Sequence, residues 1–178
     1  METETAQFEA TILPHLNAAH NLARWLIGNE EDARDMVQEA YLRAFKFFGG
    51  FRGGDSRAWI LKIVRNTAYS WLQRRSKFER MVESEEEMEK FEDVSVNPTQ
   101  LLARNATIEM VRAAIAQLLP EFREAIVLRE MEGFAYKEIA DITGVRIGTV
   151  MSRLARGRRD LLRILTESDK SESRGTAS

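Results

Sequence analysis

The sequence predicts an all-α protein made of two small helical domains, the second a helix-turn-helix domain, joined by a flexible acidic linker. Apolar residues recur with the period of a helix along most of the chain, and no segment alternates as a strand would. An acidic run at residues 83–93 interrupts this pattern and offers little from which to build a core. We expect domains at residues 1–80 and 98–167, a linker at 81–97 and a disordered tail at 168–178.

Two helices are predicted before residue 50. The first carries an apolar stripe over residues 8–26 and ends at Gly28. A bend is expected near Pro14, because proline has no amide hydrogen to donate within a helix. The second helix carries its apolar stripe over residues 33–48 and stops at Gly49.

A third helix is predicted from an N-cap at Asp55 or Ser56 to about Arg75. Its residues divide into two opposite faces when each is placed about 100° after the last. The apolar face holds Ile60, Leu61, Val64, Ala68, Trp71 and Leu72, and the polar face holds Lys62, Arg65, Asn66, Tyr69 and Gln73.

The second domain is predicted to contain four helices. An Asn-Pro pair at residues 97–98 and a Leu-Pro pair at 119–120 each indicate the start of a helix, with the second helix ending near Gly133. A short helix at 136–143 and a longer one after Gly144 complete the domain.

The last two helices have the pattern of a helix-turn-helix. Ala140 is small enough for two helices to cross closely, Gly144 can take a positive φ, and Val150 returns the second helix to the core. The side chains left facing outward suit base edges and phosphates in a major groove. They are Arg146, Thr149, Met151, Ser152, Arg153, Arg156 and Arg159. On these residues alone, a structural helix pair with a solvated basic face is an equal alternative.

Composition and motifs argue against several other functions. The formal net charge is −2, so only the distribution of charge bears on nucleic-acid binding. With no cysteine, and with His15 and His20 five residues apart, no metal site is expected. The chain has no Gly-rich phosphate loop or nucleophile elbow, so we expect neither a cofactor nor an enzyme. Without a signal peptide or an apolar span, a cytoplasmic protein that does not insert into membranes is expected.

Four segments of the chain resemble the bacterial sigma factors of the extracytoplasmic-function branch, which are promoter-recognition subunits of RNA polymerase. They are DARDMVQEAYLRAF (32–45), SRAWILKIVRNTAYSWLQRR (56–75), LPEFREAIVLREMEGFAYKEIADITG (119–144) and GTVMSRLARGRRDL (148–161). Two positions depart from the family pattern: Arg146 stands where proline is common, and Met151 stands where a basic residue is common. These departures leave the promoter sequence open.

The resemblance implies that the second helix binds the coiled coil of the polymerase beta-prime clamp. Asp35, Gln38, Glu39 and Leu42 lie three or four residues apart, opposite the apolar stripe of that helix. An exposed leucine among carboxylates and an amide suits a basic helical partner. Without the resemblance, an ordinary solvated face would be the more favoured interpretation.

By the same resemblance, the third helix and the loop before it recognise and melt the minus-ten element. Asn66 and the loop beside Phe51 lie where the family captures a flipped base, with Arg52 as a further candidate. Lys62 and Arg65 are expected to hold phosphates. The helix-turn-helix residues would recognise the minus-35 element.

The leading hypothesis is therefore a sigma factor that binds core RNA polymerase, including its beta flap, and directs initiation at specific promoters. An anti-sigma factor is expected to regulate it. Two alternatives remain: a dimeric repressor that binds operators without polymerase, and an interaction module that sequesters another factor. The inducing signal and the class of anti-sigma factor cannot be inferred from the sequence.

Overall fold

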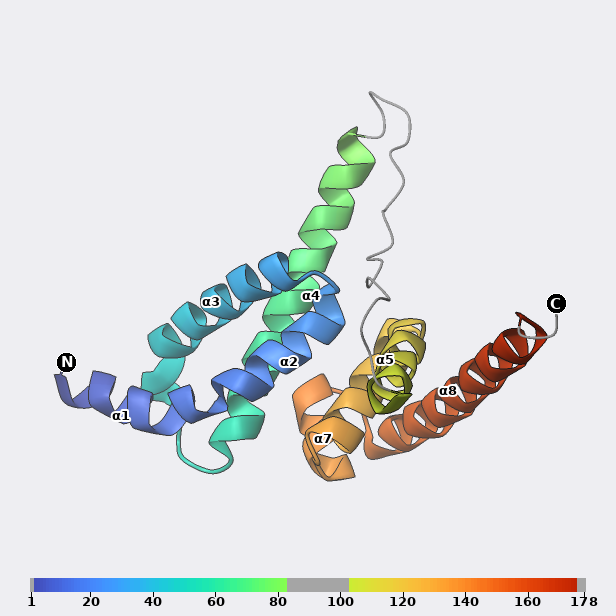
Figure 1. Ribbon diagram of the computed structural model, residues 1–178. Coiled ribbons are helices and arrows are strands. Elements are labelled where there is room, and N and C mark those ends of the chain that lie inside the picture. Colours follow the sequence, from blue (N-terminus) through green and yellow to red (C-terminus); the bar gives the residue numbers. More distant parts are fainter. Residues whose placement is uncertain (1, 83–102, 176–178) are drawn as a thin grey trace.

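The computed structural model describes residues 2–82 and 103–175 (Figure 1). Both ranges are helical and contain no strand, which confirms the all-α prediction. The predicted linker lies outside the described residues except at its first two positions, and so does the Asn-Pro pair at 97–98.

The amino-terminal domain begins with a helix that is broken at the predicted proline. Helix α1 (Glu2–Ile12) is followed by a 3₁₀ turn, η1 (Leu13–His15), and then by α2 (Leu16–Ile27). Helix α2 ends at Gly28, whose φ of 81° is the left-handed conformation that glycine adopts without strain. The side chain of Asn29 then accepts a hydrogen bond from the Asp32 amide at 3.0 Å and caps the next helix.

Helices α3 (Glu30–Phe47) and α4 (Ser56–Val82) complete the domain, joined by the 3₁₀ turn η2 (Phe48–Gly50) and a short loop. The N-cap of α4 is Asp55, whose carboxylate accepts a hydrogen bond from the Ala58 amide at 3.0 Å. Helix α4 continues beyond its predicted end at Arg75. An ion pair one turn apart, from Arg75 Nε to Glu79 Oε1 at 2.8 Å, supports the added turns.

The core of this domain lies where α2, α3 and α4 pack on one another. The predicted apolar face of α4 is fully buried over its first four members, whereas Trp71 and Leu72 are only partly buried. Thr67 is also buried, and its hydroxyl donates to the Ile63 carbonyl at 2.7 Å, which satisfies its hydrogen-bonding capacity within the helix.

The carboxyl-terminal domain consists of α5 (Ala103–Ala116), α6 (Pro120–Ile126), a π turn η3 (Val127–Met131), α7 (Tyr136–Thr143) and α8 (Ile147–Gly175). Helix α8 packs against α5, α6 and α7. Gly157 lies at the crossing with α6, where an added Cβ would come within 3.1 Å of Ile126 Cγ1. A side chain at this position would therefore force the two helices apart.

The last helix corrects one prediction. Residues 168–175, expected to belong to a disordered tail, continue α8 to Gly175. Contacts one turn apart support this extension. Arg163 pairs with Glu167 at 3.5 Å, and the Ser168 hydroxyl donates to the Ile164 carbonyl at 3.0 Å.

The two domains pack directly against each other. Helix α4 contacts α7, and α2 contacts α6 and η3 (Figure 1). The sequence was interpreted as two bodies joined only loosely, so this interface is an addition to the predicted architecture. It covers part of the polar face of α4.

Candidate nucleic-acid interface

Helices α7 and α8 form the predicted helix-turn-helix. Helix α7 ends at Gly144, which has a φ of 72° and donates its amide to the Ala140 carbonyl at 2.9 Å. The chain then turns sharply into α8. Val150 and Leu154 are each 1% exposed and attach the start of α8 to the domain core.

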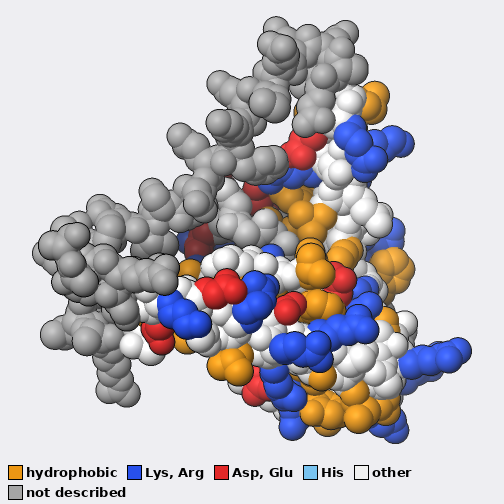
Figure 2. All heavy atoms as spheres, turned by 90° about the vertical axis from the view of Figure 1, so that its right-hand side faces the viewer, with side chains coloured by type: hydrophobic (Ala, Val, Ile, Leu, Met, Phe, Trp, Pro, Cys, Tyr) orange, Lys and Arg blue, Asp and Glu red, His pale blue; other side chains and the backbone are white. Residues whose placement is uncertain are grey.

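The residues predicted to contact the minus-35 element do not all lie in the same environment. Five are exposed, and two, Thr149 and Arg153, are partly buried. The exposed five are Arg146, Met151, Ser152, Arg156 and Arg159. Figure 2, which views the molecule from the side of α8, shows Lys and Arg side chains gathered over the lower part of the described surface. An exposed basic face therefore exists where the sequence predicted it.

Arg153 differs from the other arginines of α8 because its charge acts across the domain interface. Burial and the nearby carboxylate of Glu124 raise the pKa of Tyr69 on α4 to about 12, while the charges of Arg65 and Arg153 oppose that rise. Arg153, which is predicted to contact bases, therefore also lies close to α4.

The predicted minus-ten residues of α4 are divided between solvent and the domain interface. Lys62 and Asn66 are exposed. The side chain of Arg65 is only 19% exposed, and its Nε donates to Glu124 Oε1 of α6 at 2.7 Å. Its guanidinium also lies over the Tyr69 ring, 4.3 Å from the ring centre. Arg65 is therefore engaged by the other domain in this arrangement.

The loop before α4 presents one aromatic and one cationic side chain. Gly53 and Gly54 have φ values of 85° and 97°, so this turn favours glycine at both positions. Phe51 is partly buried, with its ring centre 5.2 Å from that of Trp59 and 5.9 Å from that of Phe48. Arg52 is exposed beside it. Trp59 thus belongs to a cluster that supports Phe51.

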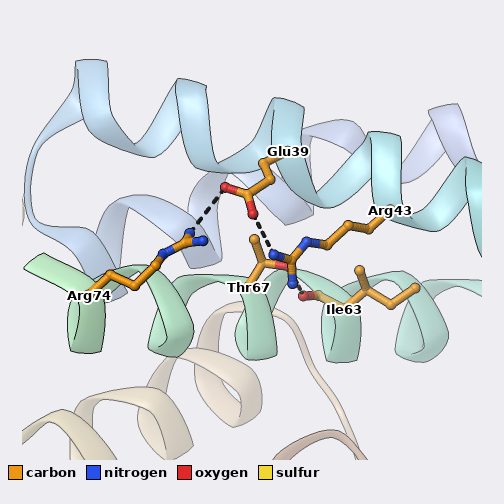
Figure 3. A network of polar contacts seen from close by, with 5 residues as sticks. All are labelled: Glu39, Arg43, Ile63, Thr67 and Arg74. Atoms are coloured by element: carbon orange, nitrogen blue, oxygen red, sulfur yellow. Dashed lines mark hydrogen bonds and ion pairs between the residues drawn. The ribbon is translucent and has the colours of Figure 1, made fainter.

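The predicted polymerase-binding face of α3 is open to solvent. Asp35, Gln38 and Leu42 are exposed, and Leu42 shows 67% of its surface. Glu39 is instead held by Arg43 at 2.6 Å and by Arg74 of α4 at 3.4 Å (Figure 3). A partner with basic side chains would therefore meet an exposed leucine and a carboxylate already held in place.

A surface groove of about 510 Å³ lies beside this face, between α2 and α3. It is lined by Leu16, Asn17, His20, Arg34, Val37, Gln38 and Tyr41. Because Gln38 belongs to both, the groove is continuous with the predicted polymerase surface.

The described residues offer neither a metal site nor a membrane span. Within residues 2–82 and 103–175, no group of three His, Cys, Asp or Glu side chains could hold a metal ion. His15 is instead hydrogen-bonded to the Ser56 hydroxyl at 2.9 Å, which joins η1 to the start of α4. No described helix is long and apolar enough to span a bilayer.

Sequence reasoning missed the acidic residues that contact the amino-terminal domain. Glu124 is 1% exposed and accepts from Arg65 and Tyr69, while Glu132 accepts from Arg57 and Asn21. One signal was present: Glu124 directly precedes a run of apolar residues at 125–128. A charged residue beside such a run indicates a buried partner.

Two family descriptions match the chain: "Sigma-70 region 2" over residues 11–78, and "Sigma-70, region 4" over residues 108–161. The ECF RNA polymerase sigma factor SigE of Mycolicibacterium smegmatis is 33% identical over 171 residues, which cover 89% of this chain and 66% of that protein. The RNA polymerase sigma-H factor of Pseudomonas aeruginosa is 31% identical over 161 residues, covering 85% of this chain and 82% of that protein.

A solved structure has the same arrangement of helices. It is the sigma factor RpoE in complex with the anti-sigma factor NepR from Bartonella quintana, with a TM-score of 0.76 and 29% identity. The match covers 90% of this chain and 97% of that chain. The chain therefore belongs to the sigma-70 family of RNA polymerase sigma factors, in its extracytoplasmic-function branch.

Proposed function

We propose that this chain binds core RNA polymerase through α3 and directs initiation at promoters with two recognised elements. Helix α8 recognises the minus-35 element, while α4 and its preceding loop recognise and melt the minus-ten element. The observation that carries this proposal is the presence of three separate exposed surfaces: the Leu42 face of α3, the basic face of α8, and Lys62 with Asn66 on α4.

The contact with polymerase centres on Leu42. A leucine that is 67% exposed gains apolar burial when a helical partner covers it, and the neighbouring Asp35 and Glu39 select basic side chains on that partner. Glu39 contributes from a fixed position because Arg43 and Arg74 already hold it. The occupant we propose is the coiled coil of the beta-prime clamp, while the carboxyl-terminal domain binds the beta flap.

Recognition of the upstream element falls to the exposed face of α8. In a helix-turn-helix, residues early in the second helix contact base edges, and later cations contact phosphates. Ser152 and Arg156 are exposed in the first part of α8, and Arg159 follows on the same side. Met151 provides an apolar contact where a cation is common in the family, so the preferred base at its position should differ.

Opening the minus-ten element requires more than charge. Removing a base from the stack costs a few kcal/mol. Stacking of the base on an aromatic side chain recovers about 1–3 kcal/mol. Phe51, supported by Trp59, can offer such a surface, and Asn66 can hydrogen-bond an extruded base. Lys62 and Arg65 then hold the backbone of the separated strand.

Three further features complete the proposal. The chain has no catalytic activity of its own and acts as a specificity subunit. It works in the cytoplasm, where polymerase and promoter DNA are found. An anti-sigma factor regulates it, as NepR forms a complex with the similar RpoE of Bartonella quintana.

The test is transcription in vitro with purified core polymerase on a genomic library, followed by mapping of start sites. We expect defined start sites that share two upstream elements. Leu42→Arg should abolish transcription, because it places a charge at the centre of the polymerase contact. Phe78→Arg is the matched control, since Phe78 is 68% exposed in the same domain but lies on α4.

Two outcomes would contradict the proposal. One is a folded chain that does not associate with core polymerase. The other is a stable dimer that binds palindromic duplex without polymerase, which would indicate a repressor.

A further inference from the structure

The first turns of α8 expose two rows of side chains to solvent, with members four residues apart in each row. One row consists of Ile147, Met151 and Ala155, and the other of Gly148, Ser152 and Arg156. Val150 and Leu154 of the same turns are instead buried in the domain core. The two rows therefore make up the outward face of the helix-turn-helix.

The first row is apolar. Ile147 is 44% exposed and Met151 is 52% exposed, although both side chains are large and hydrophobic. They lie one turn apart and are neighbours on the helix surface, and the exposed Ala155 continues the row. Exposed hydrophobic residues that occur singly are common on protein surfaces. Two neighbours on the outward face of a helix-turn-helix indicate a partner, because their burial against it is favourable.

The second row has no side chain that donates hydrogen bonds to DNA before Arg156. A Cβ at Gly148 would meet nothing within 4 Å, so the surface is open at this position. The Ser152 hydroxyl donates to the Thr149 carbonyl at 3.0 Å, so its proton is used within the helix and its oxygen accepts. Guanine presents the acceptors N7 and O6 in the major groove and needs a donor. The centre of this face therefore does not suit guanine.

Cations lie at the two ends of this face. Arg146 is exposed directly before α8, and its backbone carbonyl accepts from the Thr149 and Val150 amides at 2.9 and 3.1 Å, so the helix begins here. Arg156 is exposed further along the helix. At about 1.5 Å per residue, the helix rises about 15 Å between these arginines, which is the length of about four base pairs. The apolar row thus lies between two cations that can hold DNA on either side of it.

We infer that the apolar row recognises thymine: Ile147 and Met151 pack on thymine C5-methyl groups at the centre of the minus-35 element, between the positions contacted by Arg146 and Arg156. Thymine presents a methyl group in the major groove, and apolar side chains recognise it by direct contact. This inference rests on the proposed function, because α8 must enter the major groove of that element. It gives Ile147 a role in specificity and assigns a base to Met151.

The methyl contact can be measured without changing any hydrogen bond. Deoxyuridine differs from thymidine only by the absence of the C5-methyl group, so it pairs with adenine in the same way. Loss of one buried methyl group corresponds to about fourfold in a binding constant. 5-Methylcytosine provides the reverse change, because it places a methyl group on a base that normally has none.

The experiment uses holoenzyme assembled from the full-length chain and core polymerase, on a promoter whose start site has been mapped. Each thymine of the minus-35 element, on either strand, is replaced in turn by deoxyuridine. We expect wild type to bind about fourfold more weakly after replacement at one or two central positions. Met151→Ala should not distinguish thymine from deoxyuridine at one of these positions, and Ile147→Ala should not do so at the other. At the Met151 position, 5-methylcytosine should bind wild type about fourfold more tightly than cytosine, and should give Met151→Ala no advantage.

Met131→Ala is the matched control. Met131 is 41% exposed in the same domain but lies on η3 and not on the outward face of α8. The variant loses the same type of side chain, so it should keep the wild-type response to deoxyuridine at every position.

Three results would overturn thymine recognition. They are wild-type binding that no deoxyuridine changes, a response of wild-type size in both Met151→Ala and Ile147→Ala, and a Met151→Ala variant that loses affinity for core polymerase but keeps its response to deoxyuridine. The last result would indicate a protein contact. If the unmodified promoter is transcribed normally in these cases, the proposed function stands and only thymine recognition is wrong. A folded chain that transcribes no promoter with core polymerase would overturn both.

Discussion

The two surfaces that we propose bind DNA differ in what covers them. The basic face of α8 is open, with Arg156 and Arg159 exposed. The polar face of α4 is exposed at Lys62 and Asn66. At Arg65 it is covered, because this arginine pairs with the buried carboxylate of Glu124 from the other domain. Of the two proposed surfaces, only the one on α4 is therefore partly covered by the other domain.

The covered position on α4 is also a point at which the two domains bind each other. Glu124 is fully hydrogen-bonded only when the domains touch. Because Arg65 pairs with Glu124, a phosphate could bind this arginine only in competition with that carboxylate.

The largest effect is expected for Gly157→Leu, which should disturb the packing of α8 against α6. Even its first added atom, Cβ, would lie only 3.1–3.4 Å from atoms of Ile126 and Phe122. We expect the free energy of unfolding of the carboxyl-terminal domain to fall by about 3 kcal/mol. Hydrogen exchange of the α8 amides would report this, and the weakened domain should uncover α4 and increase binding of minus-ten DNA.

Gly148→Ala is the control for that experiment. No atom lies within 4 Å of a Cβ at Gly148, which is also in α8. Its stability should be unchanged or rise by up to about 1 kcal/mol, because alanine is the better helix former. Equal exchange in both variants would show that the close crossing at Gly157 is unimportant.

The next largest effect should come from Arg156→Ala on the open face. Loss of a base contact should weaken binding of polymerase holoenzyme to the minus-35 element by about 2 kcal/mol. The loss should be the same in a Glu132→Ala background, because Glu132 contacts Arg57 of α4 and Asn21 of α2 and not α8. Arg163→Ala, which removes an exposed arginine paired with Glu167, should change binding little. A loss that depends on Glu132 would mean that the contact between the domains affects both surfaces.

A smaller effect is expected for Lys62→Ala on the covered face. Removing one phosphate contact should reduce the slope of log K against log salt by about 1. Titrations of minus-ten DNA at several salt concentrations measure this slope. The reduction in slope should be clearer in Glu132→Ala, in which Arg57 of α4 loses its ion pair with the other domain. Lys77→Ala, further along α4, is the matched control. An equal change of the salt slope in Lys77→Ala would mean that Lys62 makes no special phosphate contact.

The smallest effect is expected for Tyr69→Phe. At 3.3 Å, the hydroxyl makes a long hydrogen bond to Glu124, so its loss should weaken the contact between the domains by less than about 1 kcal/mol. Tyr41→Phe is the control, because that hydroxyl donates at 3.4 Å to the Ile12 carbonyl within one domain. The distance between spin labels on cysteines that replace the exposed residues Gln7 of α1 and Ala113 of α5 should shift slightly in the first variant only. A large shift would mean that Tyr69 contributes more than Arg65 to the contact between the domains.

Local features of the fold could be predicted because they depend on single residues. Pro14 breaks the first helix, and Gly28 and Gly144 end theirs with a positive φ. The lengths of α4 and α8 could not be predicted from apolar periodicity. Their last turns are polar and are supported by pairs one turn apart, such as Arg75 with Glu79.

The candidate sites were predicted in part. The sequence correctly indicated that Leu42 and Arg156 are exposed, because helical spacing places them opposite the core. It did not indicate that Arg65 is covered, since its partner lies 59 positions away in the chain. Contacts between domains leave no local periodicity to detect. Only the unusual position of Glu124, beside an apolar run, indicated a buried partner.

The central claim is that each domain recognises its own promoter element on one polymerase. Double-mutant cycles in transcription test it most directly, with Arg156→Ala and Asn66→Ala each combined with base changes in either element. We predict coupling of about 1 kcal/mol or more for Arg156 with the minus-35 element and for Asn66 with the minus-ten element, and none for the crossed combinations. Equal coupling of either residue to both elements, or no coupling at all, would contradict the account.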